Sequence, residues 1–144
     1  MYTTLKDLHS YWAFIVLIVL IAAVVNALMR SKKEYSEKSF RIALFSLIVS
    51  HIQLILGLIL YFVSPLFDLW NTLGSGVMKD AEARLNLVEH PLINILAIVL
   101  ITIGYSKHKR KVESSKKYKT ILIFYTLGLL LLLSRIPWDV WPRF

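Results

Sequence analysis

Three histidines of this chain, His9, His51 and His90, lie inside or at the edge of apolar stretches long enough to cross a membrane. An ionisable side chain at such a position is costly, so it is a candidate functional residue. Imidazole is also a common axial ligand of haem iron. The pattern therefore predicts a small membrane protein that holds haem b, with two of the three histidines as ligands of the iron.

Two further polar residues are predicted to serve the same cofactor. Asn94 lies one helical turn after His90, where its amide could hydrogen-bond an imidazole or a substituent of the macrocycle. Arg135 lies near the end of the last apolar stretch, and its guanidinium could neutralise a haem propionate. Asn94 and Arg135 thus join the histidines as predicted cofactor-binding residues, and no catalytic residue is predicted.

Each of these residues also has a purely structural interpretation, which stays open. His9 could be an ordinary residue at the level of the lipid headgroups. His90 precedes Pro91, and the pair could simply begin a helix. Asn94 could hydrogen-bond a neighbouring helix, and Arg135 could extend its charge to the membrane surface.

The composition limits the class of protein. The chain has 144 residues, enough for one domain; 57% are hydrophobic and 18% are charged, which is too apolar for an ordinary soluble domain. The absence of cysteine excludes disulfides, iron–sulfur clusters, covalently attached c-type haem and thiol catalysis. No nucleotide-binding loop, nucleophile elbow or hydrolase triad is present in the sequence, so any enzymatic activity is expected to be redox chemistry.

Four apolar segments, at residues 8–29, 42–63, 88–106 and 120–137, predict membrane-spanning helices, since about 20 mostly apolar residues cross a bilayer. We expect an all-α, integral membrane four-helix up-down bundle formed by residues 1–144. The segments 30–41 and 107–119 together hold 12 Lys and Arg against 3 acids, whereas the rest of the chain holds 5 against 6. The positive-inside rule then places both basic loops in the cytoplasm and both termini outside.

Two expectations concern the loops. Residues 79–88 read as a short amphipathic helix in the second loop, with Ala81, Leu85 and Val88 on one side, lying on the outer membrane surface before the third span. His108, in the second basic segment, is expected to be solvated. The basic loops are short and carry no nucleic-acid motif, so no nucleic-acid partner is predicted.

Depth along the helices relates the candidate residues to each other. Counting about 1.5 Å per residue from the basic segments places His9, His90 and Arg135 about 31, 26 and 24 Å away, and His51 about 15 Å away, near the midplane. A cofactor in the core of a four-helix bundle can be held from facing helices. His9 and His90 are therefore placed to ligate one iron, and His51 remains a substitute for His9.

Small residues follow both histidines at helical spacing. His9 is followed by Ala13, Val16, Leu20, Ala23 and Ala27, and His90 is followed by Asn94, Ala97, Ile101 and Gly104. Such stripes would make room for a flat macrocycle, and they are equally typical of close helix packing in membranes.

Several segments resemble a small four-span family of Bacteroidota membrane proteins that is labelled cytochrome b-like. They are LHS at 8–10, SHIQLILGLILYF at 50–62, MKD at 78–80, VEHP at 88–91, IGYS at 103–106 and IPW at 136–138. The chain is also distantly similar to half of the haem A synthase fold, and by that resemblance His9 and His90 would be the haem ligands. The acid-x-x-His-Arg motif of that enzyme is missing, because Lys6 stands three residues before His9 and Ser10 follows it. The resemblance thus implies haem binding in a bacterial inner membrane, and the missing motif argues against haem A synthesis.

Three functions follow as hypotheses. The first is a b-type cytochrome that passes electrons between membrane quinol and a partner, in or beside the respiratory chain. The second is an accessory or scaffold subunit of a larger membrane complex, without a cofactor. The third is a small transporter or haem-handling protein that uses His51.

Overall fold

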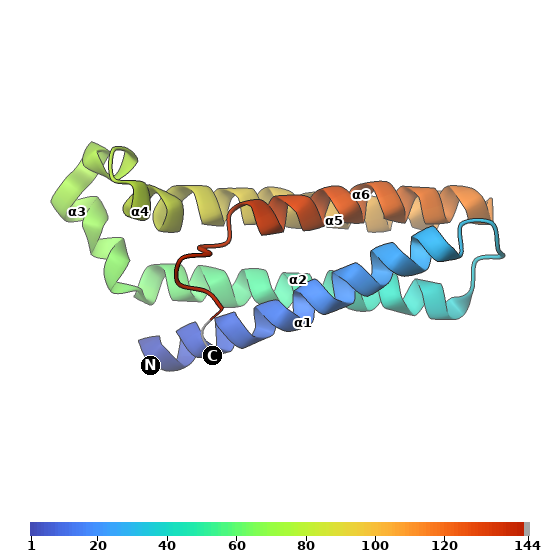
Figure 1. Ribbon diagram of the computed structural model, residues 1–144, viewed down its shortest axis with the longest axis horizontal. Coiled ribbons are helices and arrows are strands. Elements are labelled where there is room, and N and C mark those ends of the chain that lie inside the picture. The colour runs from blue at the N-terminus through green and yellow to red at the C-terminus, as the bar shows by residue number, and fades with distance from the viewer. Residues whose placement is uncertain (143–144) are drawn as a thin grey trace.

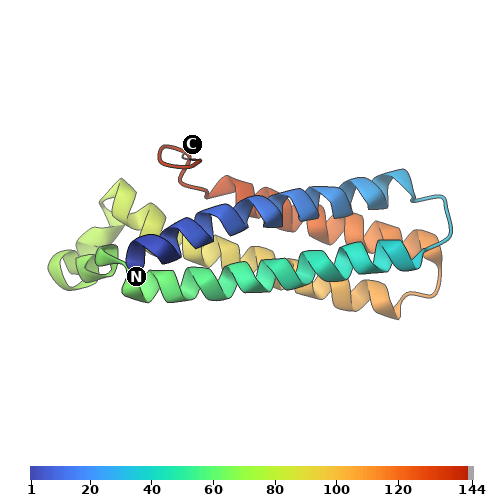
Figure 2. The ribbon, with the colours of Figure 1, turned by 90° about the horizontal axis from the view of Figure 1, so that it is seen from below.

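The computed structural model describes residues 1–142 and is all-helical over that range, which confirms the predicted fold class. Four long helices make up the body: α1 (Tyr2–Met29), α2 (Glu37–Val63), α5 (His90–Arg110) and α6 (Ser114–Ser134). Figure 1 shows that each of them runs opposite to the one before it. Figure 2 shows the same four rods from below, side by side along the long axis. α1 packs on α2 and α6, and α5 packs on the same two helices, so α1 and α5 are diagonal partners.

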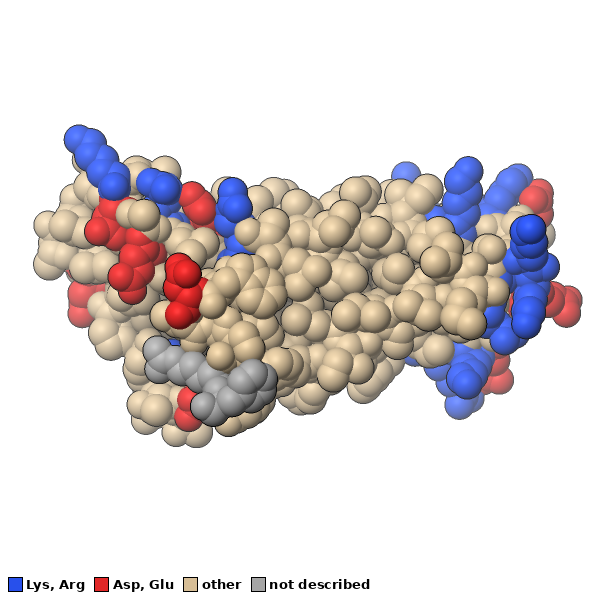
Figure 3. Space-filling view, viewed as in Figure 1, with Lys and Arg blue, Asp and Glu red and all other residues tan. Residues whose placement is uncertain are grey.

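All four helices are long and apolar enough to cross a membrane, the third of them counted from Ala81 to Arg110. Large apolar side chains remain exposed along their outer faces, as suits contact with lipid rather than water. Lys and Arg gather at the end that carries the α1–α2 and α5–α6 connections, and most of the acidic side chains in view lie at the other end (Figure 3). We call these the basic end and the histidine end.

The third long helix begins earlier than the hydropathy pattern predicts. After α2 the chain forms η1 (Pro65–Asp68), α3 (Leu69–Leu73) and η2 (Gly74–Met78), and then α4 (Ala81–Arg84), a π-helical turn η3 (Leu85–Glu89) and α5 follow without a break. The short helix predicted at 79–88 therefore forms, as α4 and η3, but it continues directly into α5 as the first turns of the third long helix. The Asp80 side chain caps that helix by accepting a hydrogen bond from Ala83 N–H.

Pro91 lies inside this continuous helix, where a proline usually breaks the ladder because it has no N–H. The π turn just before it widens the backbone, a common way to accommodate such an interruption. The Tyr61 hydroxyl of α2 donates to the carbonyl of Leu87, and the Trp70 indole donates in turn to the Tyr61 oxygen. These two hydrogen bonds thus connect α2 and the loop after it to the π turn of the third long helix.

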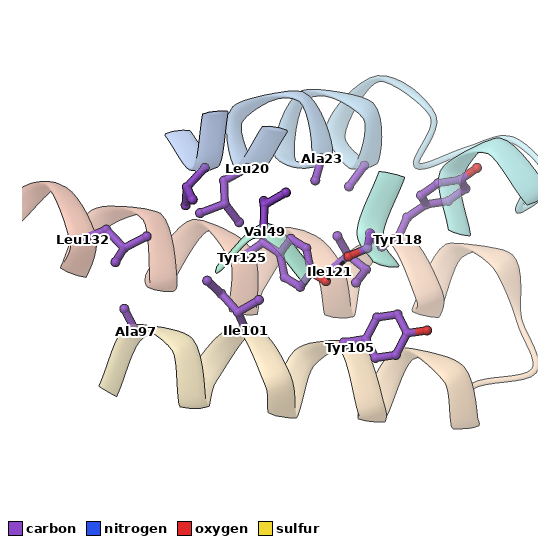
Figure 4. Packing of buried hydrophobic residues seen from close by; sticks show 13 residues of the cluster. Leu20, Ala23, Val49, Ala97, Ile101, Tyr105, Tyr118, Ile121, Tyr125 and Leu132 are labelled. Atoms are coloured by element: carbon purple, nitrogen blue, oxygen red, sulfur yellow. Dashed lines mark hydrogen bonds between the residues drawn. The ribbon is translucent and has the colours of Figure 1, made fainter. Parts of the chain in front are cut away.

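The core between the helices follows the predicted stripes. On α1 the buried residues are Val16, Leu20, Ala23 and Ala27, all on the face that begins at His9. Figure 4 shows side chains from all four long helices meeting around Tyr125 and Ile101. The Tyr125 hydroxyl donates to the carbonyl of Ala43 at 2.7 Å, which ties α6 to α2.

The small residues of α5 and α6 are used for close helix packing. A Cβ added at Gly104 would lie 2.3 Å from the Cβ of Phe124, and one added at Gly128 would lie 2.7 Å from Cγ1 of Ile101. Gly104 was expected to leave room for a macrocycle; instead, the backbone there approaches α6 too closely for any side chain. This is the small-residue packing typical of membrane helices.

Candidate functional site

His9 and His90 meet at the histidine end of the bundle. Their ring centroids are 6.2 Å apart, and the ring planes are inclined by 76°. The two residues lie on diagonal helices, α1 and the first turn of α5, and both side chains are partly buried. The depth count along the helices placed these two histidines at one level, and in the structure their rings are neighbours.

The hydrogen bonds of His90 fix its tautomer. Its Nδ1 lies 2.7 Å from the carbonyl oxygen of Arg135, which can only accept, so Nδ1 carries the proton. Its Nε2 is then the acceptor, and the Asn94 amide donates to it at 3.0 Å. Asn94 therefore forms the predicted hydrogen bond to the imidazole. A neutral imidazole that donates from Nδ1 to a carbonyl and offers Nε2 is the usual state of a metal-ligating histidine.

His9 is held from α2. The Gln53 amide donates to the His9 carbonyl at 3.0 Å, and its nitrogen lies 3.4 Å from His9 Nε2. Gly57, one turn further along α2, gives the imidazole its place: a Cβ there would lie 3.1 Å from His9 Cε1. A larger residue at Gly57 would thus push the ring.

Three buried polar atoms around the pair have no hydrogen-bond partner among the described residues: Nδ1 of His9, Oε1 of Gln53 and Oδ1 of Asn94. Buried polar atoms are almost always paired, and leaving one unpaired costs about 1–3 kcal/mol. All three belong to side chains that hold or form the histidine pair. Four further buried polar atoms without a partner lie elsewhere in the described chain: Arg30 Nε, Tyr35 Oη, His108 Nε2 and Thr126 Oγ1.

Arginine side chains flank the pair. Glu89, next to His90, contacts Arg84 Nε at 2.8 Å and Arg135 Nε at 3.2 Å. The three side chains are between 31% and 48% exposed, so each ion pair adds little to stability, and the group has a net charge of +1. The side chain of Arg135 is paired with Glu89, while its backbone carbonyl holds His90. Both parts of this residue therefore contact the predicted site.

His51 lies apart from the pair. Its Nδ1 donates to the carbonyl of Leu47 in its own helix at 2.8 Å, and its Nε2 lies 3.5 Å from the Thr102 hydroxyl of α5. Thr102 itself donates to the carbonyl of Ile98. The imidazole is thus hydrogen-bonded within α2 and lies against the Thr102 side chain of α5, rather than beside His9 or His90.

The sequence led us to expect a solvated His108. In the structure its side chain is fully buried. Its ring lies among Tyr35, Phe40 and Tyr105, with centroid distances of 5.6, 6.0 and 5.1 Å, and its Nδ1 donates to the carbonyl of Tyr105. Tyr35 lies in the connection between α1 and α2, where burial, with neighbouring phenols, raises the pKa of its hydroxyl well above the usual value. The basic end is therefore closed by an aromatic cluster around the buried His108, beneath its surface charges.

Gln53 and Gly57 were not predicted as site residues. Counted from Arg41, Gly57 lies about 24 Å along α2, close to the depth of His90. Depth could therefore have placed Gly57 at the level of the histidine pair. Whether Gly57 faces His9 depends on how α2 packs against α1, which a residue count does not give.

Two imidazoles can supply the protein ligands of a haem iron, but they are too few for a metal ion that needs three or more side chains. Among residues 1–142 there is no group of three or more His, Cys, Asp or Glu side chains that could hold a metal ion. A haem iron takes only its two axial ligands from the protein. Comparison with protein-family models, with curated proteins and with solved structures finds no match to this chain.

Proposed function

We propose that this protein binds haem b non-covalently in the membrane, with His9 and His90 as axial ligands, and that it transfers electrons. The observation that carries the proposal is the 6.2 Å between the two ring centroids. A metal–imidazole bond is about 2 Å and the ring centre lies about 1 Å further, so two imidazoles on one metal have centres about 6 Å apart. The pair therefore has the separation that one shared iron requires.

The protonation of His90 supports the same proposal. Its Nδ1–H is committed to the Arg135 carbonyl, which leaves the lone pair of Nε2 for a metal, and Asn94 would have to release that nitrogen. The unpartnered oxygens of Gln53 and Asn94 and the Nδ1 of His9 supply polar contacts beside the pair. Arg84 and Arg135, at the rim, supply positive charge for carboxylates such as propionates.

When bound, haem would supply reversible one-electron transfer, and the chain would supply ligands, an apolar surrounding and charge at the rim. We propose membrane quinol and a respiratory or other membrane complex as the electron donor and acceptor. We further propose a bacterial inner membrane as the location, with the basic end in the cytoplasm and both termini outside, because 12 of the 17 Lys and Arg lie in the two basic segments. The resemblance to the cytochrome b-like proteins of Bacteroidota agrees with this proposal.

The test is a visible spectrum of the protein purified in mild detergent after expression with ample haem, together with a pyridine haemochrome assay. We expect a Soret band, a sharp α-band on reduction with dithionite, and about one haem b per chain. His90→Ala and His9→Ala should each lose most of the haem. His51→Ala and His108→Ala remove the same ring elsewhere and should keep it. A colourless wild-type protein, or full haem content in His90→Ala, would refute the proposal.

One observation favours the second function, an accessory or scaffold subunit without a cofactor. Both nitrogens of His90 already have protein partners, Arg135 and Asn94. In that case the pair joins α1, α5 and the end of α6, and the exposed apolar faces serve a partner complex. Stoichiometric co-purification of a membrane partner with colourless protein would support this function over haem binding.

A further inference from the structure

A basic groove lies on the lipid-facing side of the bundle, at the basic end, between α5 and α6. It has a volume of about 250 Å³. Four lysines surround it, two from the end of α5 and the residue after it and two from the first turns of α6: Lys107, Lys111, Lys116 and Lys119. Its lining is completed by Thr120, Ile123 and Phe124.

The floor of the groove is set by the contact between the two helices. At Gly104 the backbone of α5 approaches the Cβ of Phe124 so closely that no side chain fits between them. One turn further toward the basic end, Lys107 extends over the ring of Phe124, with Nζ 5.5 Å from its centroid. An apolar floor thus lies directly beneath ammonium groups.

The positive charge of the groove is largely uncompensated. Lys116 contacts Glu113 at 2.9 Å, whereas Lys107, Lys111 and Lys119 have no carboxylate partner among residues 1–142. Four lysines and one glutamate leave a net charge of +3. A larger groove between α1 and α2, of about 550 Å³, differs in this respect, because its Arg41 is paired with Glu37 at 2.6 Å.

Apolar stripes lead from the groove toward the middle of the bundle. Ile123, Leu127 and Leu130 follow Lys119 at helical spacing on α6, and all three are exposed. Ile103 and Val99 lie one and two turns from Lys107 on α5 and are exposed as well. Ammonium groups at the end of a spanning helix, with exposed apolar side chains in line below them, match a lipid with an anionic headgroup and two acyl chains.

We propose that the groove between α5 and α6 is a binding site for one anionic glycerophospholipid. The lysines hold the phosphate, and the acyl chains lie along the exposed stripes of α5 and α6. This proposal is independent of haem binding, because the groove and the histidine pair are at opposite ends of the bundle.

Native mass spectrometry of the detergent-purified protein would test the site. The protein is titrated with phosphatidylglycerol and, separately, with phosphatidylcholine of the same acyl chains. We expect one tightly bound phosphatidylglycerol, at least tenfold weaker binding of phosphatidylcholine, and no displacement by an equal concentration of inorganic phosphate. Equal affinity for the two lipids, or displacement by phosphate, would overturn the proposal.

The double variant Lys107→Gln/Lys119→Gln removes one unpaired charge from each helix. We expect a roughly 20- to 30-fold loss of phosphatidylglycerol affinity, since each Lys near an anionic surface contributes about 1 kcal/mol. The control is Lys32→Gln/Lys33→Gln, which removes two exposed charges from the other connection at the same end and should lose less than threefold. An equal loss in both variants would show that net charge, and not the groove, binds the lipid. Unchanged far-UV circular dichroism establishes that each variant is folded, and the comparison of the two lipids on wild-type protein tests the site without any substitution.

Discussion

The contact between Gly104 of α5 and Phe124 of α6 predicts a large effect of a very small change. In Gly104→Ala the new methyl group would lie 2.3 Å from Phe124 Cβ and 2.9 Å from its Cγ, whereas ordinary contacts are 3.4–4 Å. The two helices would have to separate by about 1 Å, because a Cβ cannot rotate away from its own backbone. Overpacking costs about 1–3 kcal/mol, and we expect the upper end here.

Part of this cost is offset, since alanine favours a helix over glycine by up to about 1 kcal/mol. The expected net destabilisation of Gly104→Ala is therefore about 2 kcal/mol. Reversible unfolding by SDS in mixed micelles, followed by far-UV circular dichroism, measures it. Gly76→Ala is the matched control, because its Cβ would lie 3.5 Å from Leu73 Cβ, an ordinary contact.

A second comparison separates the backbone clash from the aromatic ring. Phe124→Ala keeps the Cβ that makes the 2.3 Å contact, so most of the cost of Gly104→Ala should persist in that background. The reasoning fails if Gly104→Ala unfolds within about 0.5 kcal/mol of wild type, the range of a neutral surface change. It also fails if Phe124→Ala restores full stability.

Three further substitutions test the positions of buried groups. Gly57→Ala should cost less than about 1 kcal/mol in SDS unfolding, because the imidazole edge of His9 can move a few tenths of an ångström. If the histidine pair binds haem, a haem titration of this variant should show several-fold weaker binding. Unchanged affinity would argue against His9 as a ligand. Tyr61→Phe should destabilise by about 1–3 kcal/mol in the same assay, because it removes the hydroxyl group from a helix carbonyl and a tryptophan N–H; an effect below 0.5 kcal/mol would show that neither bond matters. His108→Ala should cost about 2–4 kcal/mol, as for a cavity in a packed core, while haem content stays unchanged; a neutral result would mean that this ring is exposed.

Much of the fold could be predicted from the sequence because it depends on one-dimensional properties. The length and hydropathy of each apolar segment indicated four long helices, and helical spacing identified the buried face of α1 from Val16 to Ala27. The start of the third helix could not be found in this way. The apolar run weakens before Pro91, but the helix continues upstream through a π turn that Tyr61 supports from another helix.

The candidate site shows the same division. Depth along a helix is a simple count of residues, and it brought His9 and His90 to one level. It says nothing about which way a side chain faces, so it could not show that His51 lies beside Thr102 and not beside the other two histidines. His108 misled us for a related reason: its sequence neighbours are cations, whereas the rings that bury it include Tyr35 and Phe40, which come from elsewhere in the chain.

The polarity of the histidine end bears on the choice between the two proposed functions. Helix packing alone accounts for Gly104 and Gly128, which let two helix backbones come close. It also accounts for the tyrosine hydroxyls, which donate hydrogen bonds to backbone carbonyls. It does not account for Gln53 and Asn94, whose amide nitrogens contact the two histidines while their buried oxygens have no partner in the described chain. Within a bilayer such groups cost more than apolar side chains of the same size. A protein that used this end only as a joint between helices would be more stable with apolar residues there. The two amides are thus consistent with the proposed bound group, and the 6.2 Å between the imidazole centroids is consistent with the proposed metal between them.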